Sequence, residues 1–385
     1  MAGIREYINQ FGDKTFEEYP FNDSDALTLS ELIYMPFEKV VSRSFDAEPK
    51  NYAVAANELF GIREFKHKKL GLMITNHASI NMMAMANTKR YSQMRIVAVQ
   101  EVYSVKPAIQ YCAGTFILPD GTLVCVFRGT DDTIAGWKED LDLFTHKNPP
   151  AYTMALEYVE TLAKKFEGDI LICGHSKGGN LALMAALRCS DEVRARIKGV
   201  YNNDGPGFHD YGIFHLGTYE EILPVYKHYV PSSSFIGMMM AHDYDYKAVK
   251  STMHLGPFQH DVGTWKIKDG ELETVPDIDI LAKITDAALA IVCSYADDKG
   301  CKAVDNIVTA FTDGLGQPNL TDTAKHALSA IGGAFRAVKE ISPDVKDVVK
   351  ETFEGAGKQV FEAVKSIKGS NIAELTEKAF EAITR

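Results

Sequence analysis

The sequence has no uninterrupted apolar run long enough to span a bilayer, and residues 1–21 have no apolar core of the signal-peptide type. These absences argue against a membrane-spanning or exported chain, so we expect a cytoplasmic protein. Basic residues are in the minority, since 41 Lys and Arg stand against 52 Asp and Glu for a formal net charge of -11. A surface of that sign does not attract nucleic acid, so we expect no nucleic-acid partner.

The sequence also has none of the usual metal or nucleotide motifs: no H-E-x-x-H, no C-x-x-C pair and no P-loop. Its six cysteines are scattered, and Cys125 and Cys173 lie in apparent core strands. They are typical of small buried hydrophobic residues, not of a disulfide framework or a zinc cluster. Asp131 and Asp132 suit the first turn of a helix better than a calcium site. We therefore expect no metal and no cofactor.

The chain is long for one compact core, with 385 residues of which 46% are hydrophobic and 24% charged. Strand patterns at 95–102, 169–173 and 199–203 and a hairpin over 114–127 alternate with helical periodicity at 25–41 and 152–166. This order predicts an α/β fold, a mostly parallel sheet with helices on both faces. Residues 222–229 and 248–251 are candidates for further strands, and 264–274 for a terminal hairpin.

The composition changes from about Asp277 onward, where Ala, Val, Lys and Glu dominate. Apolar residues such as Val345, Val349 and Phe353 recur at helical spacing. We therefore predict a main domain over 1–276 and an amphipathic helical extension over 277–385. The extension is expected to pack on the main domain or to mediate self-association. Binding to a membrane surface is the less favoured alternative, because the excess of basic residues in it is small.

The segment GHSKG, residues 174–178, lies between an apolar run and a helical pattern and matches G-x-S-x-G. A serine hydroxyl is a poor nucleophile unless a rigid turn presents it to a histidine base and to backbone N–H donors. The pattern therefore predicts Ser176 as a nucleophile, with the N–H of Lys177 facing the oxyanion. Two glycines around a serine also occur in turns without chemistry. His175 is interpreted as a packing or hydrogen-bonding neighbour.

Other motifs extend this pattern along the chain. FRGT at 127–130 precedes a W-x-x-D-L segment and then GHSKGG, which resembles the fungal-type (class three) lipases. FRGTDDTIAGWKEDLDL, GHSKGGNLALMAA, DGPGF and QHD together resemble a bacterial family of uncharacterised lipase-like proteins. The resemblance covers roughly residues 21–268, and it implies an α/β-hydrolase fold and ester hydrolysis.

The resemblance also implies roles for individual residues. Thr130, after F-R-G, would donate to the oxyanion beside the Lys177 N–H. Residues 133–143 would form a lid, with Trp137 as part of the substrate gate, although Trp137 suits a core anchor equally well. Lys177 departs from the class three pattern, in which this position is usually apolar. Its side chain can therefore change which acyl or head group fits nearby.

The base is expected late in the chain, because these hydrolases follow the order Ser, acid, His. His242, His254 and His260 lie in that window. His260 is the preferred base because it matches QHD and directly precedes the terminal hairpin, with His254 as the second choice. A surface-loop imidazole is the alternative interpretation of His260.

The acid departs from the class three pattern. Those lipases place an aspartate just before a V-P step, but KHYVP has His228 or Tyr229 there. Asp204 ends the strand after the Ser176 helix, from which a carboxylate can reach the histidine, and it is the preferred acid. It also suits a turn before Gly205-Pro206. The remaining candidates for the acid are Asp243, Asp245 and Asp261.

These residues together predict a serine esterase or lipase acting on carboxylic esters, whether acylglycerols, phospholipids or other acyl esters. Ser176, His260 and Asp204 would form the triad, with a small-molecule or lipid ester as substrate. A non-catalytic scaffold of the same fold is an alternative, since the aspartate at the V-P step is missing. A thioesterase or a peptidase is a further alternative, because the G-x-S-x-G turn does not indicate which leaving group the substrate carries.

Overall fold

The computed structural model describes residues 3–62, 77–105, 108–130, 149–208, 211–234, 236–240, 246–253 and 256–278. Contacts within the chain define two units, Met1–Ile278 and Asp279–Arg385. All described residues belong to the first unit. The helical extension predicted for 277–385 lies outside the described residues apart from its first two positions, so it stays a prediction.

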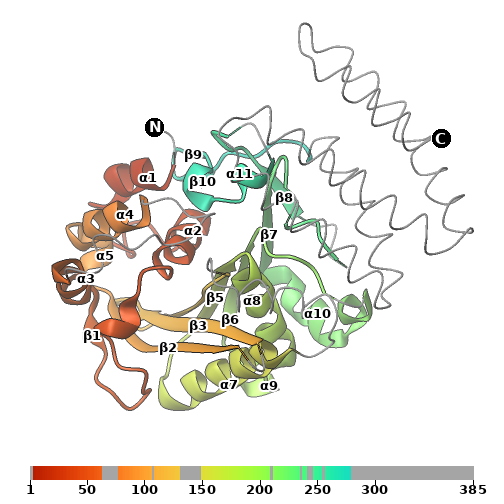
Figure 1. Cartoon of the computed structure of the whole chain (residues 1–385), viewed down its shortest axis with the longest axis horizontal. Helices are drawn as coiled ribbons and strands as arrows, with labels where there is room; N and C mark the ends of the chain where they lie inside the picture. The colour runs from red at the N-terminus through yellow and green to blue at the C-terminus, as the bar shows by residue number, and fades with distance from the viewer. Residues whose placement is uncertain are drawn as a thin grey trace, which may run out of the picture. The chain divides into compact units, whose positions relative to one another are not determined.

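One eight-stranded sheet forms the centre of this unit (Figure 1). Its strands are β1 (Lys50–Asn51), β2 (Arg95–Val105), β3 (Ala108–Ile117), β4 (Leu123–Phe127), β5 (Ile170–His175), β6 (Ile197–Asn203), β7 (Tyr226–Pro231) and β8 (Tyr246–Val249). They lie side by side in sequence order. The pairings from β1 to β4 are antiparallel and those from β4 to β8 are parallel. The sheet is therefore mixed and mostly parallel, as predicted.

Both faces of the sheet are buried. In β4, Val124 and Val126 belong to one hydrophobic cluster, whereas Cys125 and Phe127 belong to a second one. Successive side chains of a strand point to opposite faces, so the two clusters lie on opposite sides of the sheet. This explains the continuous apolar run LVCVF, since a strand covered on both faces has no polar side.

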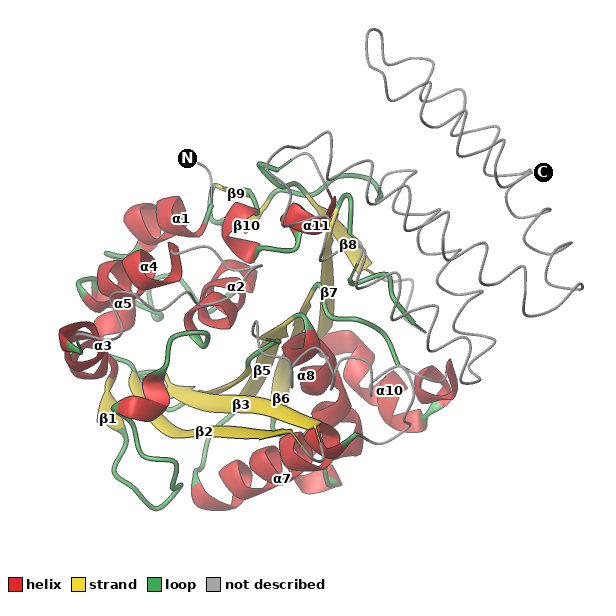
Figure 2. Cartoon of the chain, in the orientation of Figure 1, coloured by secondary structure: helices red, strands yellow, loops and turns green. Residues whose placement is uncertain are grey.

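The face of the sheet that carries Cys125 and Phe127, called here the first face, is covered by helices that connect the parallel strands. These are α7 (Pro150–Lys165), α8 (Lys177–Arg188), α9 (Asp191–Arg194) and α10 (Gly217–Ile222). Figure 2 shows α7, α8 and α10 beside the sheet. Crossovers between parallel strands are right-handed, and strands that are added in one direction place all of these helices on the same face. The second face must therefore be covered by another part of the chain.

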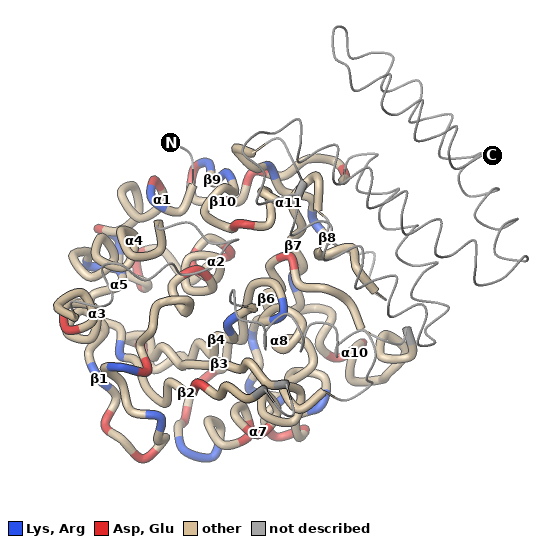
Figure 3. Tube along the Cα trace, in the orientation of Figure 1, with Lys and Arg blue, Asp and Glu red and all other residues tan. Residues whose placement is uncertain are grey.

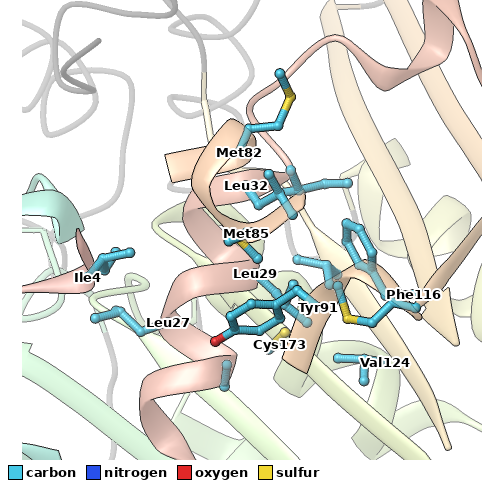
Figure 4. Packing of buried hydrophobic residues seen from close by; sticks show 14 of the residues in the cluster. Ile4, Leu27, Leu29, Leu32, Met82, Met85, Tyr91, Phe116, Val124 and Cys173 are labelled. Carbon is cyan, nitrogen blue, oxygen red and sulfur yellow. The ribbon is translucent and has the colours of Figure 1, made fainter. Parts of the chain in front are cut away.

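Helices from the N-terminal part of the chain cover the second face, which carries Val124 and Val126. They are α1 (Ile4–Phe11), α2 (Asp23–Leu32), α3 (Tyr52–Gly61), α4 (His77–Ala86) and α5 (Lys89–Ser92). Helices α2 and α3 contact the strands of the sheet, and α1, α4 and α5 pack on these two helices and on one another. Figure 4 shows Leu29 and Leu32 of α2 in one cluster with Phe116 and Cys173 of the sheet. The prediction of helices on both faces is confirmed, although α1, α3 and α4 were not predicted individually.

Several predicted boundaries were wrong. Strand β2 continues to Val105 instead of ending at residue 102, and β8 spans Tyr246–Val249 instead of 248–251. Two further boundaries differ because of a proline. The helix expected over 25–41 ends at Leu32, and Pro36 precedes a separate 3₁₀ turn, η1 (Phe37–Lys39). Strand β7 begins at Tyr226 instead of residue 222, since α10 and η4 (Leu223–Val225), which contains Pro224, occupy the preceding positions. A proline cannot donate to a helical or strand hydrogen bond, so it ends or delays the regular element.

The predicted hairpins are confirmed. Strands β3 and β4 pair in antiparallel register around a turn in which Gly121 donates to the Leu118 carbonyl at 2.9 Å. Strands β9 (Ile267–Lys268) and β10 (Glu271–Leu272) form the terminal hairpin. The remaining described elements, η3 (Tyr211–His215), α11 (Gly256–Gln259) and η5 (Val262–Thr264), lie in connections after the parallel strands.

Candidate active site

Ser176 lies in a strained turn at the carboxyl end of β5. Its φ is 58° and its ψ is -134°, a conformation that is unfavourable for a non-glycine residue. The Ser176 N–H donates to the carbonyl of Asn203 at 3.0 Å, which fixes the turn against β6. Although Ser176 occupies the N-cap position of α8, its side chain makes no capping hydrogen bond. The helix therefore does not hold the hydroxyl.

The two glycines of the turn are required by close backbone approach. A Cβ atom on Gly174 would lie 2.2 Å from the carbonyl oxygen of Gly178. A Cβ atom on Gly178 would lie 2.1 Å from the carbonyl oxygen of Phe127 in β4. Any side chain at either position would push β4, β5 and α8 apart, as the G-x-S-x-G pattern predicts.

Asp204 and His260 form a buried pair. His260 Nδ1 lies 2.7 Å from Asp204 Oδ2, and the two residues are 5% (His260) and 0% (Asp204) exposed. Asp204 directly follows β6, which pairs with β5 through the His175–Asn203 register, so the carboxylate lies one strand away from Ser176. The structure therefore brings together the acid and the base that the sequence predicts.

The second oxygen of Asp204 is also engaged. Asp204 Oδ1 accepts from Ser234 Oγ at 2.5 Å and from the Gly237 N–H at 3.0 Å. A carboxylate surrounded by donors is held as an acceptor, so His260 donates through Nδ1. In the neutral imidazole Nε2 is then the basic nitrogen. Neither Ser234 nor Gly237 was predicted, and the sequence contains no motif that marks them.

The competing candidates for the acid and the base have other positions. Asp261 accepts from the Gly263 N–H at 2.9 Å and caps η5. At the V-P step, the Tyr229 hydroxyl donates to Asp23 of α2 at 2.5 Å. His242, His254, Asp243 and Asp245 lie outside the described residues.

The FRGT segment follows β4 and lies against the turn. A Cβ atom on Gly129 would be 2.9 Å from Ser176 Cβ, so the residue directly before Thr130 lies against Ser176. Lys177 is the first residue of α8, where N–H groups have no acceptor within the helix itself. The Lys177 ammonium is buried and donates to the Gln110 carbonyl at 2.6 Å and to Gln110 Oε1 at 2.9 Å. The positive charge of Lys177 therefore lies against β3. Trp137 and the predicted lid lie outside the described residues.

A family model described as Mbeg1-like matches residues 85–309, more than half of the chain. The chain belongs to the Mbeg1-like family. This family is lipase-like and of the class three lipase type. The Mbeg1-like match contains Ser176, Asp204 and His260 together with Thr130 and Lys177, and it begins after α1, α2 and α3. No curated protein matches the sequence.

The rest of the described chain of this Mbeg1-like protein has the following features. Lys and Arg are interspersed with Asp and Glu along the described chain (Figure 3). Within the described ranges no cluster of three His, Cys, Asp or Glu has the arrangement of a metal site. None of the described helices combines the length and apolar composition needed to cross a membrane. A hollow of about 610 Å³ between α1 and α4 contains none of the site residues.

Proposed function

We propose that the protein is a serine hydrolase of the α/β-hydrolase fold that cleaves carboxylic esters. The observation that carries the proposal is the buried Asp204–His260 pair, 2.7 Å apart, at the sheet edge where Ser176 occupies a strained turn. Membership of a lipase-like family supports the same chemistry. Carboxylic esters, including acylglycerols and phospholipids, are the proposed substrate class.

The first half of the reaction forms an acyl-enzyme. Ser176 Oγ attacks the carbonyl carbon of the ester while His260 Nε2 accepts the hydroxyl proton. The Lys177 N–H and Thr130 are proposed to stabilise the oxyanion. Collapse of the tetrahedral intermediate breaks the bond to the alcohol oxygen, which takes the proton from His260.

The second half repeats the chemistry with water. His260 removes a proton from water, the hydroxide adds to the acyl carbon, and the bond to Ser176 Oγ breaks as Oγ regains its proton. The Asp204 carboxylate stabilises the imidazolium at both stages and keeps the Nδ1–H tautomer. Each turnover consumes one ester and one water and releases an acid and an alcohol.

The test is labelling of the purified protein with a fluorophosphonate probe. We expect Ser176 in the wild type to be labelled and Ser176→Ala to show no labelling. Hydrolysis of a short-chain p-nitrophenyl ester should fall by several orders of magnitude in Ser176→Ala, because the nucleophile is removed. Ser190→Ala is the matched control, since Ser190 lies at the start of α9. Undiminished turnover by Ser176→Ala would overturn the serine mechanism.

A further inference from the structure

His175 lies in the G-x-S-x-G turn directly before Ser176, and both of its ring nitrogens form hydrogen bonds. Its Nε2 lies 2.8 Å from the backbone carbonyl oxygen of His260, and its Nδ1 lies 3.0 Å from the Tyr34 hydroxyl, which follows α2. The ring is 1% exposed and lies 4.4 Å, centroid to centroid, from the ring of His260. His175 therefore joins the turn that presents Ser176 to the segment that carries the base.

The direction of these hydrogen bonds follows from their partners. A carbonyl oxygen only accepts, so His175 donates from Nε2 to His260. Nδ1 of a neutral ring is then an acceptor, and the Tyr34 hydroxyl donates to it. Burial, with a further contribution from nearby His260, lowers the pKa of His175 well below its ordinary value. The ring therefore stays neutral and keeps this single tautomer.

We propose that His175 is a positioning residue, which holds the base His260 through its backbone carbonyl. This inference rests on the proposed function for its meaning in catalysis. His260 is then fixed at the ring by Asp204 at 2.7 Å and at the carbonyl by His175 at 2.8 Å. The preceding carbonyl, of Gln259, accepts from Trp265 Nε1 at 2.8 Å. Since Ser176 directly follows His175, one short segment sets the positions of both nucleophile and base.

The neutrality of His175 also matters for the reaction. When His260 accepts the Ser176 proton it becomes an imidazolium, and a charged ring 4.4 Å away would oppose this step. A neutral His175 does not. Loss of the hydrogen bond from His175 to the His260 carbonyl should displace the base. It should therefore affect the rate of proton transfer more than the binding of substrate. A displacement of about 1 Å in a catalytic group costs on the order of 100-fold in rate.

The test compares two substitutions at one position. His175→Leu removes the donor to His260, whereas the side-chain amide of His175→Gln can still donate to the same carbonyl. We expect kcat for a short-chain ester to fall about 10- to 100-fold in His175→Leu, with KM changed less than about twofold. His175→Gln should recover most of that loss. His215→Gln, at an exposed histidine of η3, is the matched control.

A second readout does not depend on turnover. The proton on His260 Nδ1, bound to a buried carboxylate, should give a low-field ¹H NMR resonance that disappears in Asp204→Asn. We expect His175→Gln to keep this resonance and His175→Leu to shift or broaden it, while circular dichroism shows that both variants are folded. A wild-type resonance in folded His175→Leu would overturn the positioning role, and so would an unchanged kcat. If the wild type hydrolyses no ester but His175→Leu still perturbs the resonance, the proposed function fails and the positioning role stands.

Discussion

Asp204 has neighbours that define what an amide would do in its place. In Asp204→Asn the carbonyl oxygen would keep the donors Ser234 and Gly237, which turns the NH₂ group toward His260 Nδ1. That nitrogen would have to become an acceptor, so the proton would move to Nε2 and the basic nitrogen would be lost. We expect turnover to fall on the order of a thousandfold or more, with little change in the substrate concentration at half-maximal rate. Steady-state hydrolysis of a soluble ester measures both.

Asp261→Asn is the matched control for this experiment. Asp261 is a neighbour of the base, but its carboxylate caps η5 through the Gly263 N–H. Its replacement should lower stability slightly and leave turnover within a few fold of wild type. A larger loss of turnover in Asp261→Asn than in Asp204→Asn would assign the acid to the later segment.

Glu31 of α2 predicts a pH dependence of stability. The side chain is 1% exposed, its Oε2 accepts from Asn81 Nδ2 at 2.7 Å, and its Oε1 has no hydrogen-bond partner among the described residues. Burial, with a smaller contribution from Asp261, raises the pKa of Glu31 from 4.5 to about 8. The folded chain therefore retains a proton that the unfolded chain has lost between these two values.

The stabilising contribution of Glu31 is fully present below pH 4.5 and is lost as the pH rises toward 8. Across that window this group lowers the free energy of unfolding by up to about 1.4 kcal/mol per pH unit. Glu31→Gln removes the ionisation but keeps an acceptor for Asn81. Urea unfolding should therefore show Glu31→Gln gaining stability relative to wild type from acid to neutral pH. Parallel stability curves for the two proteins would contradict a protonated Glu31.

At the scale of elements, one buried ion pair ties α2 to α5. Arg90 Nε donates to Asp25 Oδ1 at 2.8 Å, a second guanidinium nitrogen pairs with Oδ2, and both side chains are 0% exposed. The guanidinium also donates to the Tyr19 carbonyl at 2.7 Å. Arg90→Met leaves the Asp25 carboxylate buried without its cation, which should cost about 3–5 kcal/mol of unfolding free energy. Unfolding in guanidinium chloride measures this loss of unfolding free energy.

The double variant Arg90→Met with Asp25→Asn separates charge from packing. The neutral amide of Asp25→Asn removes the uncompensated charge. Its oxygen can still accept from the Tyr91 hydroxyl, which donates to Asp25 Oδ1 at 2.7 Å in the wild type. We expect the double variant to be more stable than Arg90→Met alone. Equal stability of the two would show that the loss comes from packing around Arg90 instead of the buried charge.

Helix and strand boundaries show what the sequence reveals at this scale. The hairpin around Gly121 and the turn at Ser176 were predictable, because local backbone geometry demands particular residues there. Pro36 and Pro224 lie close to the end of α2 and the start of β7, but the apolar spacing continues across both prolines and indicates longer elements. The short α1 and α4 have no such local marker. They are held by packing on each other and on α2, within the hydrophobic cluster that reaches the second face of the sheet, and only the assembled chain provides these contacts.

The candidate site divides in the same way. Asp204 was predictable because the carboxyl ends of neighbouring parallel strands meet at one edge of a sheet. Ser234 and Tyr34 were not, since 30 residues separate Ser234 from Asp204 and 141 separate Tyr34 from His175. Serine and tyrosine are common residues, and nothing in their local pattern indicates a partner. Such supporting contacts become visible only when distant segments are placed together.

At the scale of the whole molecule, the family match and the described hydrophobic core begin at different residues. The match begins at residue 85, but the cluster on the second face of the sheet draws Ile4, Leu27 and Leu59 from helices that precede it. Without those helices the face of the sheet with Val124 and Cys173 would be exposed to water. Exposed apolar patches of that size lead to association or misfolding. The residues before the match are therefore part of the folded unit.

The same reasoning predicts how the chain tolerates shortening. Both described hydrophobic clusters lie within residues 4–272, and the first compact unit ends at Ile278. A chain of residues 1–278 should therefore fold cooperatively and hydrolyse a soluble short-chain ester at a rate within a few fold of the full chain. A chain that begins at residue 85 should aggregate. Size-exclusion chromatography, thermal unfolding and ester turnover together measure these outcomes.

A third chain, residues 1–309, tests the other boundary, because the family match continues past Ile278. If 1–278 and 1–309 have equal stability and turnover, the residues between 279 and 309 add nothing to the folded hydrolase unit. If only 1–309 is active, the unit extends to the end of the match, and the boundary predicted at residue 277 is wrong. Recovery of a folded, active protein from the chain that begins at residue 85 would contradict the requirement for α1, α2 and α3 on the second face.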